Sequence, residues 1–194
     1  MAIDAKKVLV GAPDQSSATG AVNRAALGTT LPTDAKSALD GSYTPAGYVS
    51  EDGASLAQDY STNDIKDWSR STVRTLLEEF TGEITFTFIQ TGYDELCAIF
   101  GDDYVTQSGD LIKVSLGAHL APAGVYVLNM KDGDTRIRVI APNAQPVPDG
   151  DLTFVANEPI SWGCKLSCNA DENGECIYVL VEETTPSSSG TPGA

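Results

Sequence analysis

The chain has 194 residues, which suits one domain, and its 41% content of hydrophobic residues is enough for a packed core. Its net charge of −15 is spread along the whole sequence and argues against tight binding to a phosphate backbone, which needs clustered Lys and Arg. It has no run of about 18 apolar residues and only a short apolar run near its N-terminus, so we expect neither membrane insertion nor a secretory signal. The acidic character fits either an ordinary soluble surface or a surface along which a polyanion passes without sticking.

The N-terminal quarter shows little periodicity after a predicted strand at Lys6–Gly11. Residues 12–46 are rich in Ala, Thr, Gly and Ser, and a loop of this length is unusual inside a compact domain. One interpretation is a long assembly arm that becomes ordered against a neighbouring subunit; the alternative is a flexible surface loop. An arm would bury four solitary apolar side chains in the neighbour: Val22, Leu27, Leu31 and Leu39.

The segment that follows is polar and broken by glycine. Gly47–Val49 favours a short strand, and Glu51–Gly53 favours a turn. Ser61–Trp68 is a polar connector, and we expect Trp68 to anchor it to the body of the domain.

A long strand is predicted over Thr72–Gln90. Its second half alternates with a period of two, as half-buried strands do. The apolar face carries Ile84, Phe86 and Phe88, and the polar face carries Glu83, Thr85 and Thr87. The first half keeps this register poorly, so we expect a bulge or bend near Glu78–Gly82.

One helix is predicted directly after this strand. Thr91 is a plausible N-cap and Gly101 a C-cap. Between them Tyr93, Leu96, Cys97 and Phe100 form one apolar stripe, which we expect to cover a face of the sheet.

Further strands are predicted in the C-terminal half. Two hairpins are expected, one around residues 131–134 and a closing one with Asn169–Gly174 at its tip. Residues 1–183 would form the domain, and the Ser/Pro/Gly-rich residues 184–194 would form a disordered tail. The expected strands are Leu111–Leu116, Val125–Met130, Thr135–Ala141, Leu152–Ala156, Ile160–Cys168 and Glu175–Val181.

The sequence contains no constellation that predicts an enzyme, a metal site or a cofactor site. Cys164, Cys168 and Cys176 lack a fourth ligand at zinc-site spacing. We expect reduced, half-buried cysteines, with a Cys168–Cys176 bridge as the alternative. His119 is the only histidine and lies beside a turn, without a nucleophile motif around it.

The ordered series of segments resembles the major tail protein of long-tailed, non-contractile bacteriophages, the siphophage protein that builds the tail tube. The resemblance covers roughly residues 19–181, and the cysteine-bearing last hairpin and the tail depart from the family pattern. The segments are TGAVNRAALGTTLPTDAKSALDG, GYVSEDG, STNDIKDW, VRTLLEEFTGEITFTFIQ, YDELCAIFG and NADENGE.

The resemblance implies a mainly β (α+β) fold, a β-sandwich or barrel-like subunit with one flanking α-helix and the long arm. Six subunits would close into a ring, and rings would stack into a helical tube in the virion tail, assembled in the host cytoplasm. The partners would be other copies of the chain, a tape measure protein, terminator and tip proteins, and double-stranded DNA in transit. Candidates for lining the lumen are Glu79, Glu83, Thr85 and Thr87. The alternative function is a β-sandwich module that binds carbohydrate or a receptor.

Overall fold

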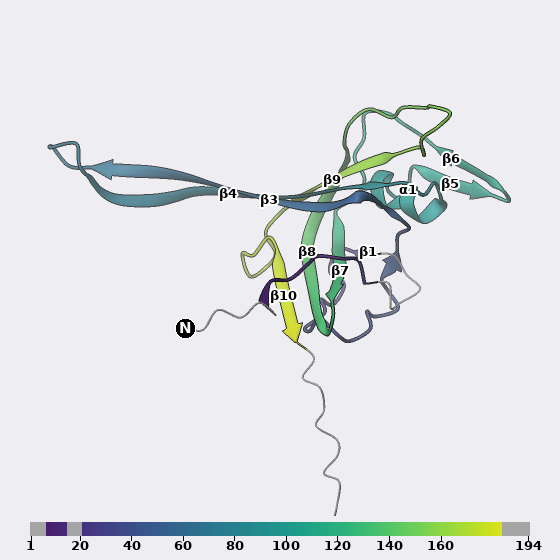
Figure 1. The fold of residues 1–194 in the computed structure, drawn as a ribbon. Coiled ribbons are helices and arrows are strands. Elements are labelled where there is room, and N and C mark those ends of the chain that lie inside the picture. The colour runs from purple at the N-terminus through teal and green to yellow at the C-terminus, as the bar shows by residue number, and fades with distance from the viewer. Residues whose placement is uncertain (1–6, 15–20, 184–194) are drawn as a thin grey trace, which may run out of the picture.

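A computed structural model of the chain describes residues 7–14 and 21–183. In this part, eight strands join in one antiparallel sheet in the order β2-β1-β7-β8-β9-β4-β3, with β10 paired to β8, and β5 and β6 form a separate pair (Figure 1). The mainly β fold with one flanking helix is therefore confirmed. The elements are β1 Val22–Ala26, β2 Thr44–Pro45, β3 Val49–Lys66, β4 Thr72–Phe88, α1 Tyr93–Phe100, β5 Val105–Ser108, β6 Leu111–Val114, β7 Gly124–Asp132, β8 Thr135–Pro148, β9 Trp162–Cys168 and β10 Tyr178–Glu183.

Strand β8 belongs to both halves of the sheet. Its first part pairs with β7 and β10, and its last part, from Ala144 onward, pairs with β9. The register between β7 and β8 shifts between Tyr126↔Ala141 and Gly124↔Ala144, where Pro142 has no N–H to donate to the ladder. The sheet therefore turns at this point, so that β3, β4 and β9 lie across the layer of β7, β8 and β10 (Figure 1).

The main core lies between the two halves of the sheet and α1. Ile84, Phe86 and Phe88 of β4 are almost fully buried there, as the alternation predicted. The core also contains Ala98 of the helix, and the hydroxyl of the buried Tyr126 donates to its carbonyl oxygen at 2.6 Å. This bond satisfies the one polar group that β7 sends into the core.

The helix runs over Tyr93–Phe100, and its C-terminal cap is confirmed. Gly101 has φ of 84°, a left-handed conformation that favours glycine, and its N–H donates to the Cys97 carbonyl at 2.9 Å. The predicted N-cap is wrong, because Gly92 occupies that position. The Thr91 hydroxyl instead accepts a hydrogen bond from the Trp162 indole N–H at 2.9 Å.

Three further predictions on strands are wrong. Residues 7–11 and Leu152–Ala156 have no strand structure; within the described residues 7–14, an isolated bridge joins Pro13 to Met130. The closing hairpin is not formed either, since β10 pairs with β8 and not with β9. The β7–β8 hairpin is confirmed, with its turn at Gly133 and Asp134.

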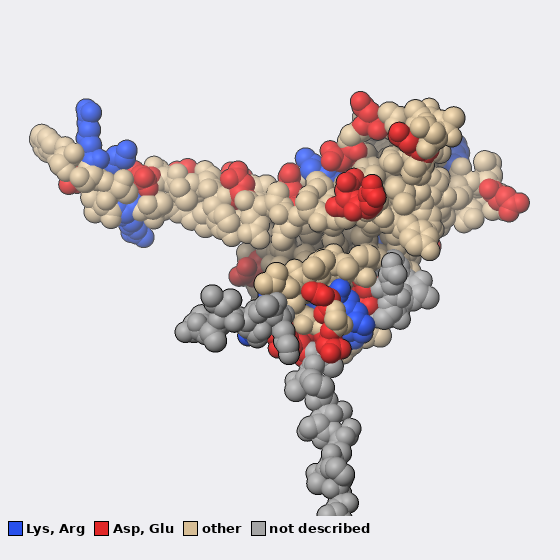
Figure 2. All heavy atoms as spheres, viewed as in Figure 1, with Lys and Arg blue, Asp and Glu red and all other residues tan. Residues whose placement is uncertain are grey.

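The most extended element is a hairpin of β3 and β4 that leaves the body of the molecule (Figures 1 and 2). The two strands have 18 and 17 residues, so the hairpin is roughly 55 Å long. Ser61–Lys66, expected as part of a connector, continues β3, and Glu51–Gly53 lie in a wide irregularity of β3 without reversing the chain. The predicted bulge is present: Glu78 is the extra residue between the pairs Ser61↔Glu79 and Thr62↔Leu77.

Residues 21–46 pack against their own subunit, so the prediction that an arm buries its apolar side chains in a neighbouring subunit is wrong for Val22, Leu31 and Leu39. Val22 is 1% exposed in β1, which lies between β2 and β7 inside the sheet. Leu31 and Leu39 pack on a second core beneath β7 and β8, and Leu27 is the exposed member of the set at 56%. Residues 15–20 of the predicted arm and the predicted tail, residues 184–194, lie outside the described part of the chain.

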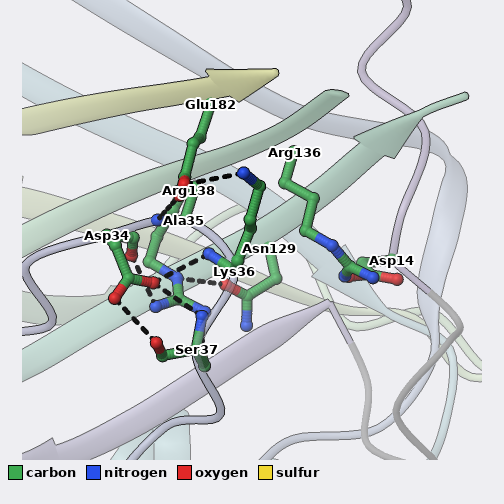
Figure 3. A network of polar contacts seen from close by, with 9 residues as sticks. All are labelled: Asp14, Asp34, Ala35, Lys36, Ser37, Asn129, Arg136, Arg138 and Glu182. Atoms are coloured by element: carbon green, nitrogen blue, oxygen red, sulfur yellow. Dashed lines mark hydrogen bonds and ion pairs between the residues drawn. The ribbon is translucent and has the colours of Figure 1, made fainter. Parts of the chain in front are cut away.

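Arg138 of β8 holds this irregular stretch in place (Figure 3). Its side chain is buried at 4% exposure and donates to the carbonyl oxygens of Asp34 and Ser37 at 2.8 and 2.9 Å. It also donates to the Asn129 side chain at 2.8 Å. Backbone carbonyls that have no strand partner are thus satisfied by one guanidinium, which explains how the stretch is ordered without periodicity.

Candidate assembly surfaces

The tip of the β3–β4 hairpin is a tight turn over residues 67–71. The Asp67 carboxylate accepts hydrogen bonds from the Ser69 hydroxyl at 2.6 Å and from the Ser71 N–H at 2.9 Å. These bonds, that of the Ser69 hydroxyl first, hold the pKa of Asp67 below its ordinary value. Trp68 points outward at 102% exposure, so the prediction that it anchors this segment to the body is wrong. The turn places the indole at the far end of the hairpin, beyond the reach of its own core.

Behind the tip, the sides of the hairpin are unusually apolar for an exposed element. Tyr60, Ile65, Val73 and Leu77 are 58, 46, 67 and 61% exposed. The best-packed contact in this region is between the rings of Tyr60 and Phe80, whose centroids are 4.8 Å apart. Isolated two-stranded hairpins are marginally stable in water, and large exposed apolar areas mark interaction sites. The outer hairpin is therefore a candidate surface for binding another molecule.

The sequence does not predict that these residues form a set. The apolar side chains near the tip do not alternate, because neither face of the outer hairpin is covered by the subunit. The available signal was apolar residues on both sides of a turn rich in Asp and Ser, in a stretch otherwise free of core residues.

The four candidates for lining a lumen lie on one face of β4. The pairing of β3 with β4 is continuous from Ser61↔Glu79 to Ala54↔Phe86, so the bulge at Glu78 lies outside this stretch. Glu79, Glu83, Thr85 and Thr87 therefore point away from Ile84 and the main core. They are half-buried or exposed.

Neighbouring strands extend this face. Lys165 of β9 forms an ion pair with Glu83 at 3.4 Å, and the Ser55 hydroxyl of β3 lies 2.5 Å from that of Thr85. The face is polar along its whole width and is mildly acidic near Glu79, which forms no ion pair with a described residue.

Three strands of the sheet have an edge without a partner among the described strands: the two-residue β2, which pairs only with β1, and the longer β3 and β10. β3 pairs only with β4, and β10 pairs only with β8. β10 also exposes Val179 and Val181, at 51 and 56%, on the side away from the core. Open apolar edges pair readily with other chains, so they are a second kind of assembly surface.

The cysteines are placed for packing. All four are free thiols, and Cys97, Cys164 and Cys168 are buried. Burial raises the pKa of Cys97 to about 11 and that of Cys164 to about 12, so these thiols stay protonated at neutral pH and are poor nucleophiles. Among the residues the structure describes, no group of three or more His, Cys, Asp or Glu side chains could hold a metal ion. His119 stacks on Tyr104 with ring centroids 3.5 Å apart.

The projecting hairpin and the open strand edges are features of a protein that makes contacts with other chains. No helix in the described residues is both long and apolar enough to cross a membrane. The family model for the phage tail tube protein matches residues 1–191, so the chain belongs to the phage tail tube protein family. It is a non-enzymatic component of the virion tail that polymerises into the tail tube. A comparison with curated proteins gave no match.

Membership in this family decides between the two functions expected from the sequence. A carbohydrate- or receptor-binding module would need aromatic side chains clustered at loop tips. Tyr43 is buried, whereas Tyr48 and Tyr60 are exposed at separate places. The resemblance to tail tube proteins is confirmed at the level of the family.

Proposed function

We propose that six copies of the chain close into a ring, and that the rings stack into the tube of a long-tailed, non-contractile phage. The observation that carries this proposal is the β3–β4 hairpin, whose outer half exposes Tyr60, Ile65, Val73 and Leu77 and packs on no part of its own core. Burial of these side chains in neighbouring copies would supply the free energy of stacking. The hairpin thus takes the role that the sequence suggested for residues 12–46.

The open edges of β3 and β10 are suited to closing the ring. Pairing between subunits would remove both edges from solvent, and a ring repeats the same contact at every junction. Val179 and Val181 would be buried at such a junction.

In this arrangement the polar face of β4 lines the lumen. Glu79, Glu83, Thr85 and Thr87 would meet double-stranded DNA during ejection, and a wall with few cations would give phosphates nowhere to bind. A tape measure protein inside the tube and terminator and tip proteins at its ends would be the other partners. Assembly would take place in the host cytoplasm.

Electron microscopy of hairpin variants tests this function. Residues 62–78 can be replaced by Asn-Gly, a two-residue hairpin turn that joins Ser61 to Glu79 and keeps the contact between Tyr60 and Phe80. The unaltered chain, concentrated and negatively stained, should form rings or tubes of uniform width. The shortened chain should stay folded by circular dichroism but form no tubes. Tubes of normal length from the shortened chain would show that the hairpin is not the stacking element.

A further inference from the structure

An apolar cavity of about 310 Å³ opens at the end of the body opposite the hairpin tip. It lies between the end of α1, residues 116–121, residues 148–152 and the start of β9. Phe100 and Trp162 form part of its wall, with an edge-to-face contact of 6.1 Å between ring centroids. The bond from the Trp162 indole to Thr91 fixes this wall, so the cavity is preformed.

The rim of the cavity is acidic and also rigid. Asp149 and Asp151 both line it. The Asp149 N–H donates to the Gly163 carbonyl at 2.9 Å, and a side chain at position 163 would collide with the Asp149 carbonyl oxygen. The two carboxylates thus belong to a loop that is held closely against β9. Leu116 and Leu120 complete the opening and are largely exposed, at 68 and 58%.

The tip of the hairpin complements this cavity in shape and charge. Trp68 is the most exposed large apolar side chain among the described residues. It lies within a basic segment that carries Lys66, Arg70 and Arg74 and only one carboxylate, in a chain with 27 acidic and 12 basic residues. Figure 2 shows Lys and Arg side chains near the end of the hairpin. An apolar cavity of about 150 Å³ binds benzene, so the larger cavity here has room for an indole.

A subunit does not reach its own cavity. Phe88 pairs with Trp162 at the inner end of β4, sixteen residues from Thr72 at the tip, a separation of roughly 50 Å along a paired strand. The tip and α1 lie at opposite ends of the molecule in Figure 1. A contact between two different patches at opposite ends joins copies head to tail, and such contacts continue as an open filament when the rotation between copies does not close a ring. That is the geometry of a growing tube.

We infer that Trp68 of one subunit inserts into the cavity beside Trp162 of a copy in the next ring. The basic side chains around Trp68 then face the carboxylates of Asp149 and Asp151. This inference rests on the proposed stacking role of the hairpin and names the partner of its tip. A buried aromatic anchor surrounded by charged pairs is the arrangement in which few residues carry most of the binding energy.

Photo-crosslinking in assembled tubes tests the contact directly. Tubes are formed from unaltered subunits mixed with a minority that carry a photo-crosslinking amino acid at position 68. After irradiation, mass spectrometry should find crosslinks to residues 116–121, 148–152 or 161–163 of another subunit. Crosslinks from intact tubes that map only elsewhere would overturn this inference and leave the tube function standing. Failure of the unaltered chain to assemble would instead count against the proposed function.

Substitutions provide the energetic test. Trp68→Ala and Leu120→Glu should each raise the critical concentration for assembly roughly tenfold or more. Tyr48→Ala, which removes another exposed aromatic side chain, serves as the matched control and should leave it unchanged. Pairing Arg70→Glu with Asp151→Arg should restore part of the assembly that either change loses alone. Equal effects of Trp68→Ala and Tyr48→Ala would contradict the inference.

Discussion

Single residues in this chain stabilise stretches that have no regular structure. Arg138 is the clearest case, because its guanidinium satisfies two carbonyls of residues 34–37 while it is nearly excluded from water. Desolvation by burial lowers the pKa of Arg138, yet the group remains charged at neutral pH. The same stretch is held a second time by the Lys36–Glu182 ion pair at 2.8 Å, on the exposed side (Figure 3).

Replacing Arg138 should therefore cost more stability than its charge suggests. We expect Arg138→Ala to lower the free energy of unfolding by about 2–4 kcal/mol, because buried carbonyls lose their donors. Arg74→Ala, on the exposed hairpin, should change it by less than about 0.5 kcal/mol. Urea denaturation of both variants measures the difference. Similar losses in the two variants would mean that residues 34–37 are held by other contacts.

At the scale of elements, the sequence predicts the helices and strands that pack on the core of the subunit, because packing gives them an apolar pattern. The inner half of β4 and the helix carry apolar residues at the period of their structure, and the β7–β8 hairpin has apolar runs on both sides of a Gly-containing turn; each of these elements was predicted correctly. The outer half of β3 carries no such period, because no layer of the subunit covers it. A mostly polar strand without this period cannot be distinguished from a connecting loop in the sequence.

The pairing of strands that are distant in the sequence could not be predicted from the sequence either. Neighbouring strands in sequence usually pair, which favours β9 with β10. Strand β8 is long enough to pair with β9 at one end and β10 at the other, and this removes β10 from β9. The prediction for Trp68 was wrong because it also depends on structure that the local sequence does not show. Trp68 was expected to bury itself in its own domain, and only the length of the hairpin shows that it cannot.

Because β1 lies inside the sheet between β2 and β7, we expect that its removal unfolds the subunit. Removing residues 22–44 takes out a strand hydrogen-bonded to β7 along five residue pairs, together with the carbonyls that Arg138 binds. We expect this deletion to abolish the cooperative thermal transition followed by circular dichroism. Replacing residues 62–78 by Asn-Gly removes 17 residues, against 23 in the first variant, and should keep that transition, since this outer part of the hairpin packs on no core. A sharp transition in the first variant would restore the interpretation of residues 12–46 as an independent arm.

At the scale of the whole molecule, charge is distributed unevenly along the axis from tip to body. The basic tip and the acidic cavity rim attract each other, whereas the bulk of the −15 net charge makes subunits repel. Subunits therefore associate only where specific contacts outweigh this repulsion. The repulsion thus suppresses association of subunits in other relative positions. The same excess of carboxylates leaves the proposed lumen face short of cations, with Lys165 paired to Glu83.

Reversing charge on this face should turn a passive wall into one that binds DNA. In tubes that carry Glu79→Lys and Glu83→Lys, each ring would add twelve cations to the lumen if it has six subunits, and phosphate contacts would form in proportion. The matched control reverses two exposed carboxylates on the β5 side, Asp103→Lys and Asp110→Lys, for the same net charge. Short duplex DNA mixed with open tubes should co-sediment with the first pair at low salt and be released as salt rises. If the control pair retains as much DNA inside intact tubes, or the first pair retains none, then β4 does not line the lumen and another face of the sheet must do so.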